Sequence, residues 1–222
     1  MSEGWPRGEE DIATQTAPRG EPSNHTGGQV GWLMYEWANQ PYFSLITIFL
    51  FSNYFANVFF QGDAADGQAY WGYTQAIAGI AIALMSPILG AMADAAGPRK
   101  PFIGVFLLGV SFGCIGLWIA EPGGALLPIM ILVIVASISA EFVTTFANAM
   151  LPNISTERRM ALLSGVGYGI AQVAGIFALA IVLFAFQLPG NIEASFIPDA
   201  PLLGLDRSAY EDERIVGPLA GL

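Results

Sequence analysis

The feature that most constrains this chain is a series of long apolar runs that carry almost no charge. Such runs cover residues 31–60, 69–93, 102–120, 125–150 and 161–187, and only Glu36 and Glu141 place a formal charge inside them. A helix needs about 20 apolar residues to cross a hydrocarbon core of about 30 Å. Only helices and closed barrels satisfy their backbone groups in lipid, so the pattern predicts an all-α, polytopic bundle of transmembrane helices.

Composition points to the same environment. Hydrophobic residues make up 54% of the chain and charged residues only 12%, whereas a soluble domain usually carries about 25% charge. The net charge of −10 comes mainly from acids in the N-terminal tail and in the connections after the first, third and fifth runs. We interpret these acids as solvated loops. The lipid bilayer is therefore the expected partner, and no nucleic acid is expected.

The cations are distributed unevenly between the connections. They precede the first run, join the second to the third and join the fourth to the fifth, as Arg7, Arg19, Arg99, Lys100, Arg158 and Arg159. The connections 61–68 and 121–124 carry no cation, and Arg207 and Arg214 in the last connection are minor exceptions. By the positive-inside rule the N-terminus is cytoplasmic. We expect a multi-pass protein of the plasma (inner) membrane if the source is bacterial.

The chain divides into a tail and one membrane unit. Residues 1–28 are rich in Pro, Gly, Glu and Thr, and we expect a disordered cytoplasmic tail there. The membrane unit, 29–222, contains the lone Cys114, which we expect to pack as a small hydrophobe. The sequence offers no cluster of metal ligands, so we expect neither a metal nor another cofactor.

Two of the runs carry polar stripes at helical spacing. At 100° per residue one face of the first run collects Glu36, Gln40, Phe43, Thr47 and Tyr54. The fourth run repeats the pattern with Ser137, Glu141, Thr144 and Asn148. Intramembrane carboxylates normally face a bundle interior or a wet cavity, so the two stripes predict one shared pathway for a solute or protons. The alternative is that these groups only hydrogen-bond between helices.

The two carboxylates differ in position. Glu141 lies about two turns before the predicted cytoplasmic end of its helix, whereas Glu36 lies nearer the interface, where water can solvate it. Glu141 is therefore the better candidate for proton or cation coupling. Small residues spaced by four, at 109/113, 165/169 and 171/175, predict close contacts between helices.

Four stretches resemble the major facilitator superfamily, and within it the vacuole-effluxer-like branch, also called unknown major facilitator family one. They are Tyr35-Glu36-Trp37-Ala38-Asn39, which has Glu36 where the branch usually has Asp, the loop 90–101, and the segments 148–154 and 164–169. The loop is similar to the superfamily pattern G-x-x-x-D-x-x-G-R-R-K-P. Pro98 replaces an arginine of that pattern, and Ala95 replaces the basic residue that many superfamily members place after the aspartate.

The resemblance implies two six-helix halves around a central cavity lined by the first and fourth helices. It also implies that the loop is a conformational gate, which here comprises Gly90, Asp94, Gly97, Arg99 and Lys100. This chain would supply five full helices and, at 214–222, the start of a sixth. We therefore expect a partial N-terminal half whose C-terminal half is missing.

The function implied by the resemblance is transport of small solutes by alternating access. Yeast-type relatives imply efflux of amino acids. A drug or metabolite exporter on the same scaffold, and a truncated product that is inactive alone, remain alternatives. A membrane-embedded enzyme is disfavoured, because no segment carries a nucleophile with a base, paired histidines or a phosphate-binding loop.

Overall fold

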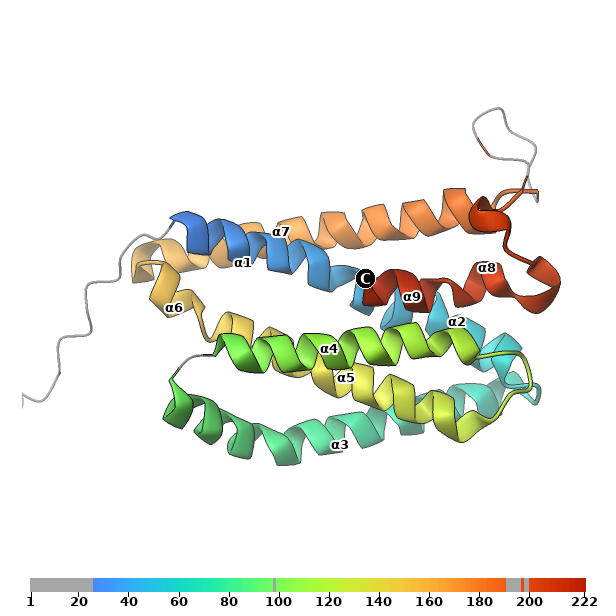
Figure 1. Cartoon of the computed structure of the whole chain (residues 1–222), viewed down its shortest axis with the longest axis horizontal. Helices are drawn as coiled ribbons and strands as arrows, with labels where there is room; N and C mark the ends of the chain where they lie inside the picture. The colour runs from blue at the N-terminus through green and yellow to red at the C-terminus, as the bar shows by residue number, and fades with distance from the viewer. Residues whose placement is uncertain (1–25, 98, 191–196, 198–199) are drawn as a thin grey trace, which may run out of the picture.

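The computed structural model describes residues 26–97, 99–190, 197 and 200–222, and the described residues form helices and no strands (Figure 1). The first span joins four helical segments: α1 (Thr26–Pro41), η1 (Tyr42–Phe49), α2 (Phe51–Tyr54) and η2 (Phe55–Phe59). The second span is α3 (Ala64–Ala96). The third combines α4 (Lys100–Gly116) with η3 (Leu117–Ile119).

The remaining spans continue in the same way. The fourth combines α5 (Leu126–Asn148) with the short α6 (Leu151–Ile154), and the fifth combines α7 (Glu157–Val182) with η4 (Leu183–Gln187). After the short turns η5 (Leu202–Gly204) and η6 (Arg207–Ala209), a sixth helical segment follows as α8 (Glu211–Arg214) and α9 (Val216–Gly221).

Five of these helices are long and apolar enough to cross a membrane, which confirms the predicted all-α transmembrane bundle. One predicted boundary is wrong. The first helix begins at Thr26, so 26–28 belong to its first turn and not to the tail. The rest of the predicted tail lies outside the described residues.

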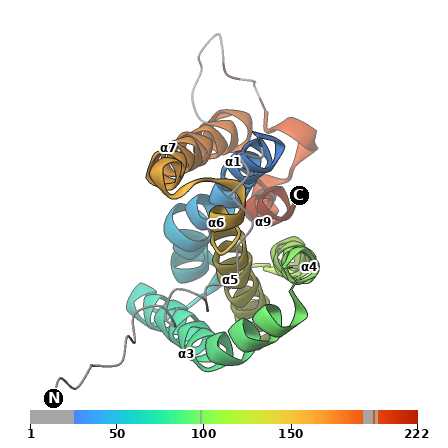
Figure 2. The same cartoon turned by 90° about the vertical axis from the view of Figure 1, so that its left-hand side faces the viewer.

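Viewed end-on, α5 lies in the middle of the bundle (Figure 2). The helices α3 and α4 pack against α5 on one side, whereas α1 pairs with α7 on the other. The helix α9 packs on α4 and on η1. The largest buried side chains belong mainly to the second half of the first span, where Phe51, Tyr54, Phe55 and Phe59 are nearly inaccessible.

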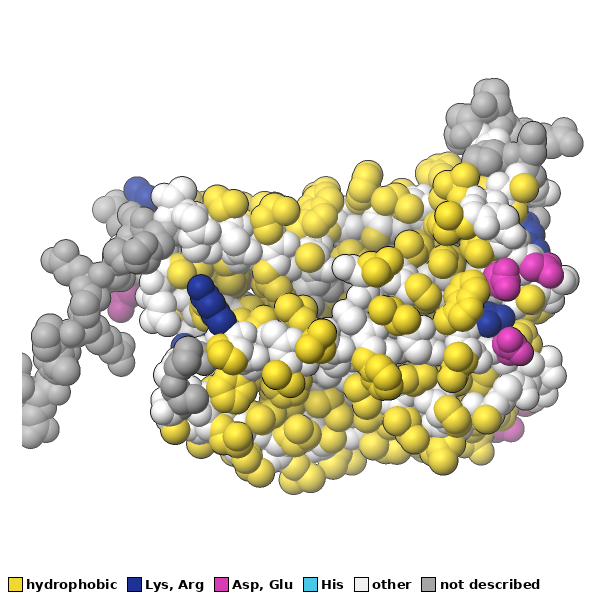
Figure 3. Space-filling model, in the orientation of Figure 1, with side chains coloured by type: hydrophobic (Ala, Val, Ile, Leu, Met, Phe, Trp, Pro, Cys, Tyr) yellow, Lys and Arg dark blue, Asp and Glu magenta, His cyan; other side chains and the backbone are white. Residues whose placement is uncertain are grey.

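The charged side chains gather at the two ends of the bundle, and apolar side chains cover its flank (Figure 3). We call the end that holds the α3–α4 turn the Arg99 end, and the opposite end the Glu121 end. Of the five spans, the first is the least apolar and the most buried, whereas α3 is strongly apolar and the least buried. The first span therefore depends most on protein contacts, and α3 offers most of its surface to its surroundings.

The first span leaves α-helical geometry after Pro41. The amide of Leu50 donates to the carbonyl of Leu45 at 3.1 Å, and the amide of Phe60 donates to the carbonyl of Phe55 at 3.0 Å. These bonds reach back five residues, as in a π-helix, and π turns occur frequently at functional sites. A π turn holds more residues than an α turn, so the side chains beyond Pro41 no longer advance by 100° per residue.

Candidate functional site: a polar contact, a cavity and an end clamp

The first and fourth spans meet through the hydroxyl of Thr144. The Tyr35 hydroxyl and the Asn39 amide nitrogen each lie 3.1 Å from Thr144 Oγ1. The Thr144 hydroxyl itself donates to the Ala140 carbonyl at 3.0 Å. Because its only proton is used in that bond, Thr144 accepts from both Tyr35 and Asn39. One hydroxyl thus satisfies two donors of α1.

A second polar chain lies further along the same contact and reaches a third helix. The Tyr42 hydroxyl lies 3.0 Å from Ser137 Oγ, and Ser137 donates to Gln75 Oε1 at 3.2 Å. Tyr42 is buried, and Gln75 belongs to α3. These hydrogen bonds therefore connect η1, α5 and α3 in a region where lipid cannot satisfy polar groups.

Beside the hydrogen bonds of Tyr42, Ser137 and Gln75 lies a cavity of about 210 Å³ between η1, α3 and α5. Its polar lining consists of Tyr42, Thr47, Gln75, Ser137 and Glu141, and its apolar wall includes Phe43. The lining contains one carboxylate, that of Glu141, and no cation. A cavity of this kind can hold a cation, a protonated amine or exchangeable protons, because an intramembrane carboxylate requires a partner or water.

The residues of the stripe predicted for the first helix do not lie on a single face, so that prediction is wrong. Glu36 packs against Gly167 and Gln40 against Gly175, so both contact α7. Phe43 and Thr47 line the cavity instead, and the buried Tyr54 donates its hydroxyl to the Ala120 carbonyl. The reason is the π-helical segment after Pro41, which rotates the later residues away from the face of Glu36 and Gln40.

The stripe of the fourth helix is regular by comparison. The structure brings Ser137 and Thr144 against the first span, and it places Glu141 at the wall of the cavity. Glu141 is exposed in the chain as it stands, and Asn148 is exposed near the Arg99 end. The two predicted stripes therefore meet only in part, at Thr47, Ser137 and Glu141.

The prediction missed Tyr35, Asn39, Tyr42 and Gln75. The first three share the spacing i, i+4, i+7 of the predicted stripe, shifted by one residue toward the N-terminus. Tyr35 and Asn39 also bracket the first of the four family-like motifs, which was a signal for their contact. Gln75 stands alone in an apolar run, and no periodicity singled it out.

Of the predicted pairs of small residues, one pair in α4 lies at a close contact between helices, whereas one pair in α7 does not. A side chain at Gly109 would meet Ser139, and one at Gly113 would meet Ala136 and the Leu132 carbonyl, so α4 and α5 approach closely there as predicted. A side chain at Gly165 or at Gly169 would meet nothing, so these two glycines do not mark a close helix contact, contrary to the prediction. Gly167, between them, packs against Trp32 and Glu36 instead.

At the Arg99 end, one arginine joins three helices. Arg99 Nη2 lies 3.0 Å from Asp94 Oδ1, and Arg99 Nη1 donates to the Ala149 carbonyl at 2.6 Å. Gly97 between them has φ +80°, a conformation that favours glycine, and its amide closes α3 on the Ala93 carbonyl. The ion pair between Asp94 and Arg99 therefore joins the end of α3 to the start of α4.

Gly90 is half-buried inside α3, and a side chain there would meet nothing. Lys100 begins α4, and its side chain is exposed at the same end. Of the five predicted gate residues, Asp94, Gly97 and Arg99 therefore form one connected turn. Gly90 and Lys100 flank it.

At the Glu121 end, Arg214 anchors the sixth helical segment. Its side chain is buried, donates from Nε and Nη2 to the Trp118 carbonyl, and lies over the Trp118 ring at 5.0 Å. Arg214 also lies 3.7 Å from Glu121 and donates to the Ala209 carbonyl at 3.2 Å. In the sequence, Arg214 was a minor exception to the uneven distribution of cations between the connections. In the structure its buried side chain anchors the sixth helical segment.

Acids beside this anchor lie in an unusual environment. Burial raises the pKa of the Glu213 carboxyl, and the neighbouring Asp212 adds to that rise. Burial also raises the pKa of Asp212, although Arg207 at 3.6 Å opposes the rise. Asp206 behaves in the opposite way, because hydrogen bonds from Ser208 lower its pKa.

A polytopic helical bundle with a polar cavity between membrane spans is the kind of arrangement that a membrane transporter requires, and this chain resembles a known protein of that class. Over 161 residues the chain is 31% identical to the uncharacterized MFS-type transporter YxiO of Bacillus subtilis (strain 168). The aligned region covers 69% of this chain but 37% of the relative, so the chain spans little more than a third of the relative's length.

This similarity supports membership in the major facilitator superfamily. No protein-family model matches the chain, and no solved structure matches it.

Proposed function

We propose that this chain forms most of the first half of a major facilitator transporter, and that the complete transporter exports small solutes, with amino acids as the first class to test. The cavity between the first, second and fourth spans is the observation that carries the proposal. It combines hydrogen-bonding side chains with one carboxylate inside a bundle that otherwise presents apolar groups to lipid. Similarity to an MFS-type transporter supports the part of this proposal that concerns transport in general.

In this proposal the Arg99 end faces the cytoplasm and a second half completes the pathway. The cations of the Arg99 end support the orientation. Transport proceeds by alternating access, in which the two halves rock around the solute. The turn formed by Asp94, Gly97 and Arg99 steadies one of the two conformations, since it ties the ends of α3 and α4 to α5.

Glu141, rather than Glu36, is the proposed site of proton or cation coupling. Glu141 lies at the wall of the cavity, whereas Glu36 packs on a glycine of α7. A carboxylate that exchanges protons with each cycle can couple solute movement to a pH gradient. Glu36 in this view supports the contact between the first and fifth spans.

The cavity also favours a second candidate function. Its lining places Glu141 near the aromatic rings of Tyr42 and Phe43 and offers no cation. Aromatic faces and a carboxylate suit an organic cation, whereas an amino acid also requires a group that binds its carboxylate. An exporter of cationic drugs or metabolites is therefore the alternative, unless the second half supplies the missing cation.

The test uses a chimera in which this chain replaces the matching segment of the Bacillus subtilis relative. The chimera is reconstituted in proteoliposomes, and exchange of radiolabelled amino acids and of organic cations is measured at several pH gradients. The variant Glu141→Gln keeps the size of the side chain but cannot ionise, so we expect it to keep exchange and to lose dependence on the pH gradient. Glu157→Gln, in the exposed first turn of α7, is the matched control.

Each outcome decides one part of the proposal. Exchange of amino acids supports the first substrate class, and exchange of organic cations alone supports the second. A pH dependence that is unchanged in Glu141→Gln would reduce this residue to a hydrogen-bonding role. A chimera that inserts and folds but exchanges neither class contradicts both candidate functions.

A further inference from the structure

Gln75 lies at the cavity between η1, α3 and α5 with its amide held in one orientation. Ser137 donates its single hydroxyl proton to Gln75 Oε1 at 3.2 Å, so Ser137 accepts from the Tyr42 hydroxyl, 3.0 Å away. These bonds engage the amide oxygen of Gln75 and leave its amide nitrogen with two N–H groups. Within the described part of the chain, that nitrogen donates to no protein group.

The face of α3 that carries Gln75 also creates the space beside it. Ala78, Gly79 and Ile82 follow Gln75 at helical spacing and line the same cavity. Ala78 is small and buried, and a side chain at Gly79 would meet nothing within 4 Å. The wall formed by α3 therefore leaves room for a small solute beside the amide.

The wall formed by α5 supplies a group of the opposite kind. Glu141 lies one turn beyond Ser137, and its ionised carboxylate can only accept hydrogen bonds. The cavity thus combines an acceptor on α5 with a donor on α3. An organic cation without a polar oxygen satisfies Glu141 but leaves the N–H groups of Gln75 unpaired, which weakens its binding. A solute with an oxygen next to its amine satisfies both walls.

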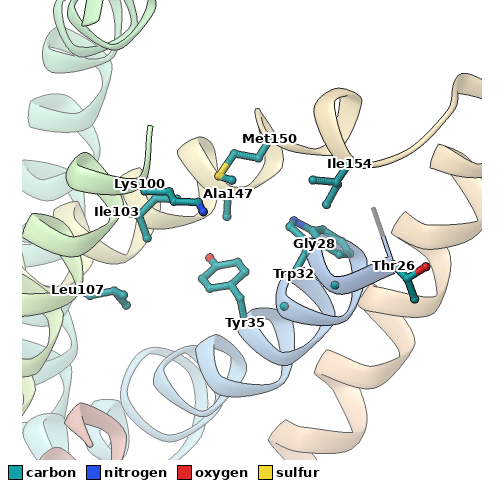
Figure 4. Close-up of a pocket in the computed structure, with 12 residues that line it drawn as sticks. Thr26, Gly28, Trp32, Tyr35, Lys100, Ile103, Leu107, Ala147, Met150 and Ile154 are labelled. Atoms are coloured by element: carbon teal, nitrogen blue, oxygen red, sulfur yellow. The ribbon is translucent and has the colours of Figure 1, made fainter. Parts of the chain in front are cut away.

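The larger groove at the Arg99 end lacks this combination. It has a volume of about 760 Å³ between α1, α4, α5 and α6, and none of the described residues that line it is a carboxylate (Figure 4). The amino group of Lys100 points into the groove, toward the Tyr35 hydroxyl, which is bonded to Thr144 (Figure 4). A cation in this place repels an amine. Selection of such a solute therefore belongs to the smaller cavity.

We propose that Gln75 is a specificity-determining residue of the transporter, and that it selects solutes in which a carbonyl or carboxylate oxygen neighbours the amine. The proposal rests on the proposed function, because it assigns the solute of the same cavity. In this assignment Glu141 binds the amine, and the amide N–H groups of Gln75 bind the oxygen. A protein cation is then not required, and the organic cations without such an oxygen are disfavoured.

Binding to the purified chain in detergent tests this assignment without any transport assay. Dissociation constants are measured by titration calorimetry for alaninamide, alanine and 3-methylbutan-2-amine. The last compound has an isopropyl group in place of the carboxamide, so it keeps the amine and the shape but lacks the oxygen. Alaninamide and alanine distinguish a neutral carbonyl from a carboxylate. We expect at least one of them to bind about tenfold more tightly than 3-methylbutan-2-amine, because unpaired donors weaken binding by about this factor.

Three variants separate recognition by Gln75 from a structural role. Gln75→Met keeps the length of the side chain and removes the amide, so it should reduce the preference to less than about twofold and leave binding of 3-methylbutan-2-amine unchanged. Gln172→Met makes the same substitution at an exposed position of α7 and should keep the full preference. Ser137→Ala keeps Gln75 but releases its amide oxygen, so it should lower the preference by about threefold. Circular dichroism checks the folding of each variant.

The unsubstituted chain alone can overturn the proposal. Equal binding of the three solutes, or no measurable binding of any of them, contradicts it. A preference that survives in a folded Gln75→Met variant also contradicts it, and if that variant does not fold, an unchanged preference in Ser137→Ala does so instead. Because exchange by the chimera is measured separately, a failure here leaves the transport function standing, and a failure of exchange leaves the binding preference standing.

Discussion

Thr144 holds two helices together with one hydroxyl group. It accepts from Tyr35 and Asn39 of α1 while it donates within α5. Its neighbour Thr145 is exposed and contacts neither donor. The two threonines are therefore a matched pair, since the same substitution removes an interhelical contact at one position and nothing at the next.

We expect Thr144→Val to lower the free energy of unfolding by about 1 to 2 kcal/mol, because two donors of α1 lose their acceptor. Thr145→Val should change it by less than about 0.5 kcal/mol. Unfolding of the purified chain in detergent, followed by circular dichroism against denaturant, measures both variants. Equal losses would mean that the Thr144 hydroxyl contributes nothing specific to the contact.

At the Arg99 end, the bond to the Ala149 carbonyl should matter more than the ion pair. The Asp94 side chain is 72% exposed, so Asp94→Asn should cost less than about 1 kcal/mol of stability. Arg99→Ala also removes the contact with α5 and should cost about 1 to 3 kcal/mol. The same unfolding assay compares them, and a larger loss in Asp94→Asn would reverse the assignment.

The acids of α8 give a pH dependence with a defined sign. Because burial raises the pKa of Glu213, the folded state binds its proton more tightly, and stability falls as the pH rises through the raised pKa. Glu213→Gln should therefore raise the unfolding temperature near pH 7 and have little effect below the ordinary carboxyl pKa of about 4.3. Unfolding temperatures measured between pH 4 and 8 test this, and a gain that grows toward low pH would contradict it.

At the scale of the elements, α4 offers a test of close helix packing. A side chain at Gly113 would lie 2.8 Å from both Ala136 Cβ and the Leu132 carbonyl oxygen, whereas one at Gly104 would meet nothing. Gly113→Ala should cost about 1 to 3 kcal/mol, because α4 and α5 must move apart. Gly104→Ala should be neutral or stabilising, since alanine favours a helix. Thermal unfolding of the two variants decides this, and equal effects would mean that the interface tolerates the shift.

The sequence predicts some of the helical elements and their faces well and others poorly. Hydropathy and length predict the five spans because burial in lipid acts on whole segments. The stripe of α5 follows from 100° per residue because that helix stays regular. The first span defeats the same rule after Pro41, where π-helical hydrogen bonds rotate Phe43 and Thr47 away from Glu36. Pro41 marks where the change begins, but no residue pattern predicts the π-helical hydrogen bonds that follow it. Arg214 became an anchor only through contacts distant in sequence.

At the scale of the whole molecule, the proposed orientation in the membrane predicts which side of the membrane each connection faces. The proposed topology puts the Arg99 end inside the cell and the Glu121 end outside. In a Cys114→Ala background, an impermeant maleimide should label Asp63→Cys from outside intact cells, whereas Arg159→Cys should react only in inverted vesicles. Both positions are exposed, so accessibility within the protein does not limit the reaction. The reverse pattern would invert the proposed orientation.

The burial of the least apolar span has a consequence for biosynthesis. During synthesis the first span leaves the ribosome with Glu36, Asn39 and Gln40 unpartnered, and its partition into lipid at that moment is weak. Tyr35 and Thr144 are 109 residues apart, so at about 5 to 20 residues per second the acceptor on α5 follows about 5 to 20 s later. Over that interval the nascent helix must be held by the translocon or a chaperone, and α3, which is strongly apolar and little buried, can enter the bilayer before it.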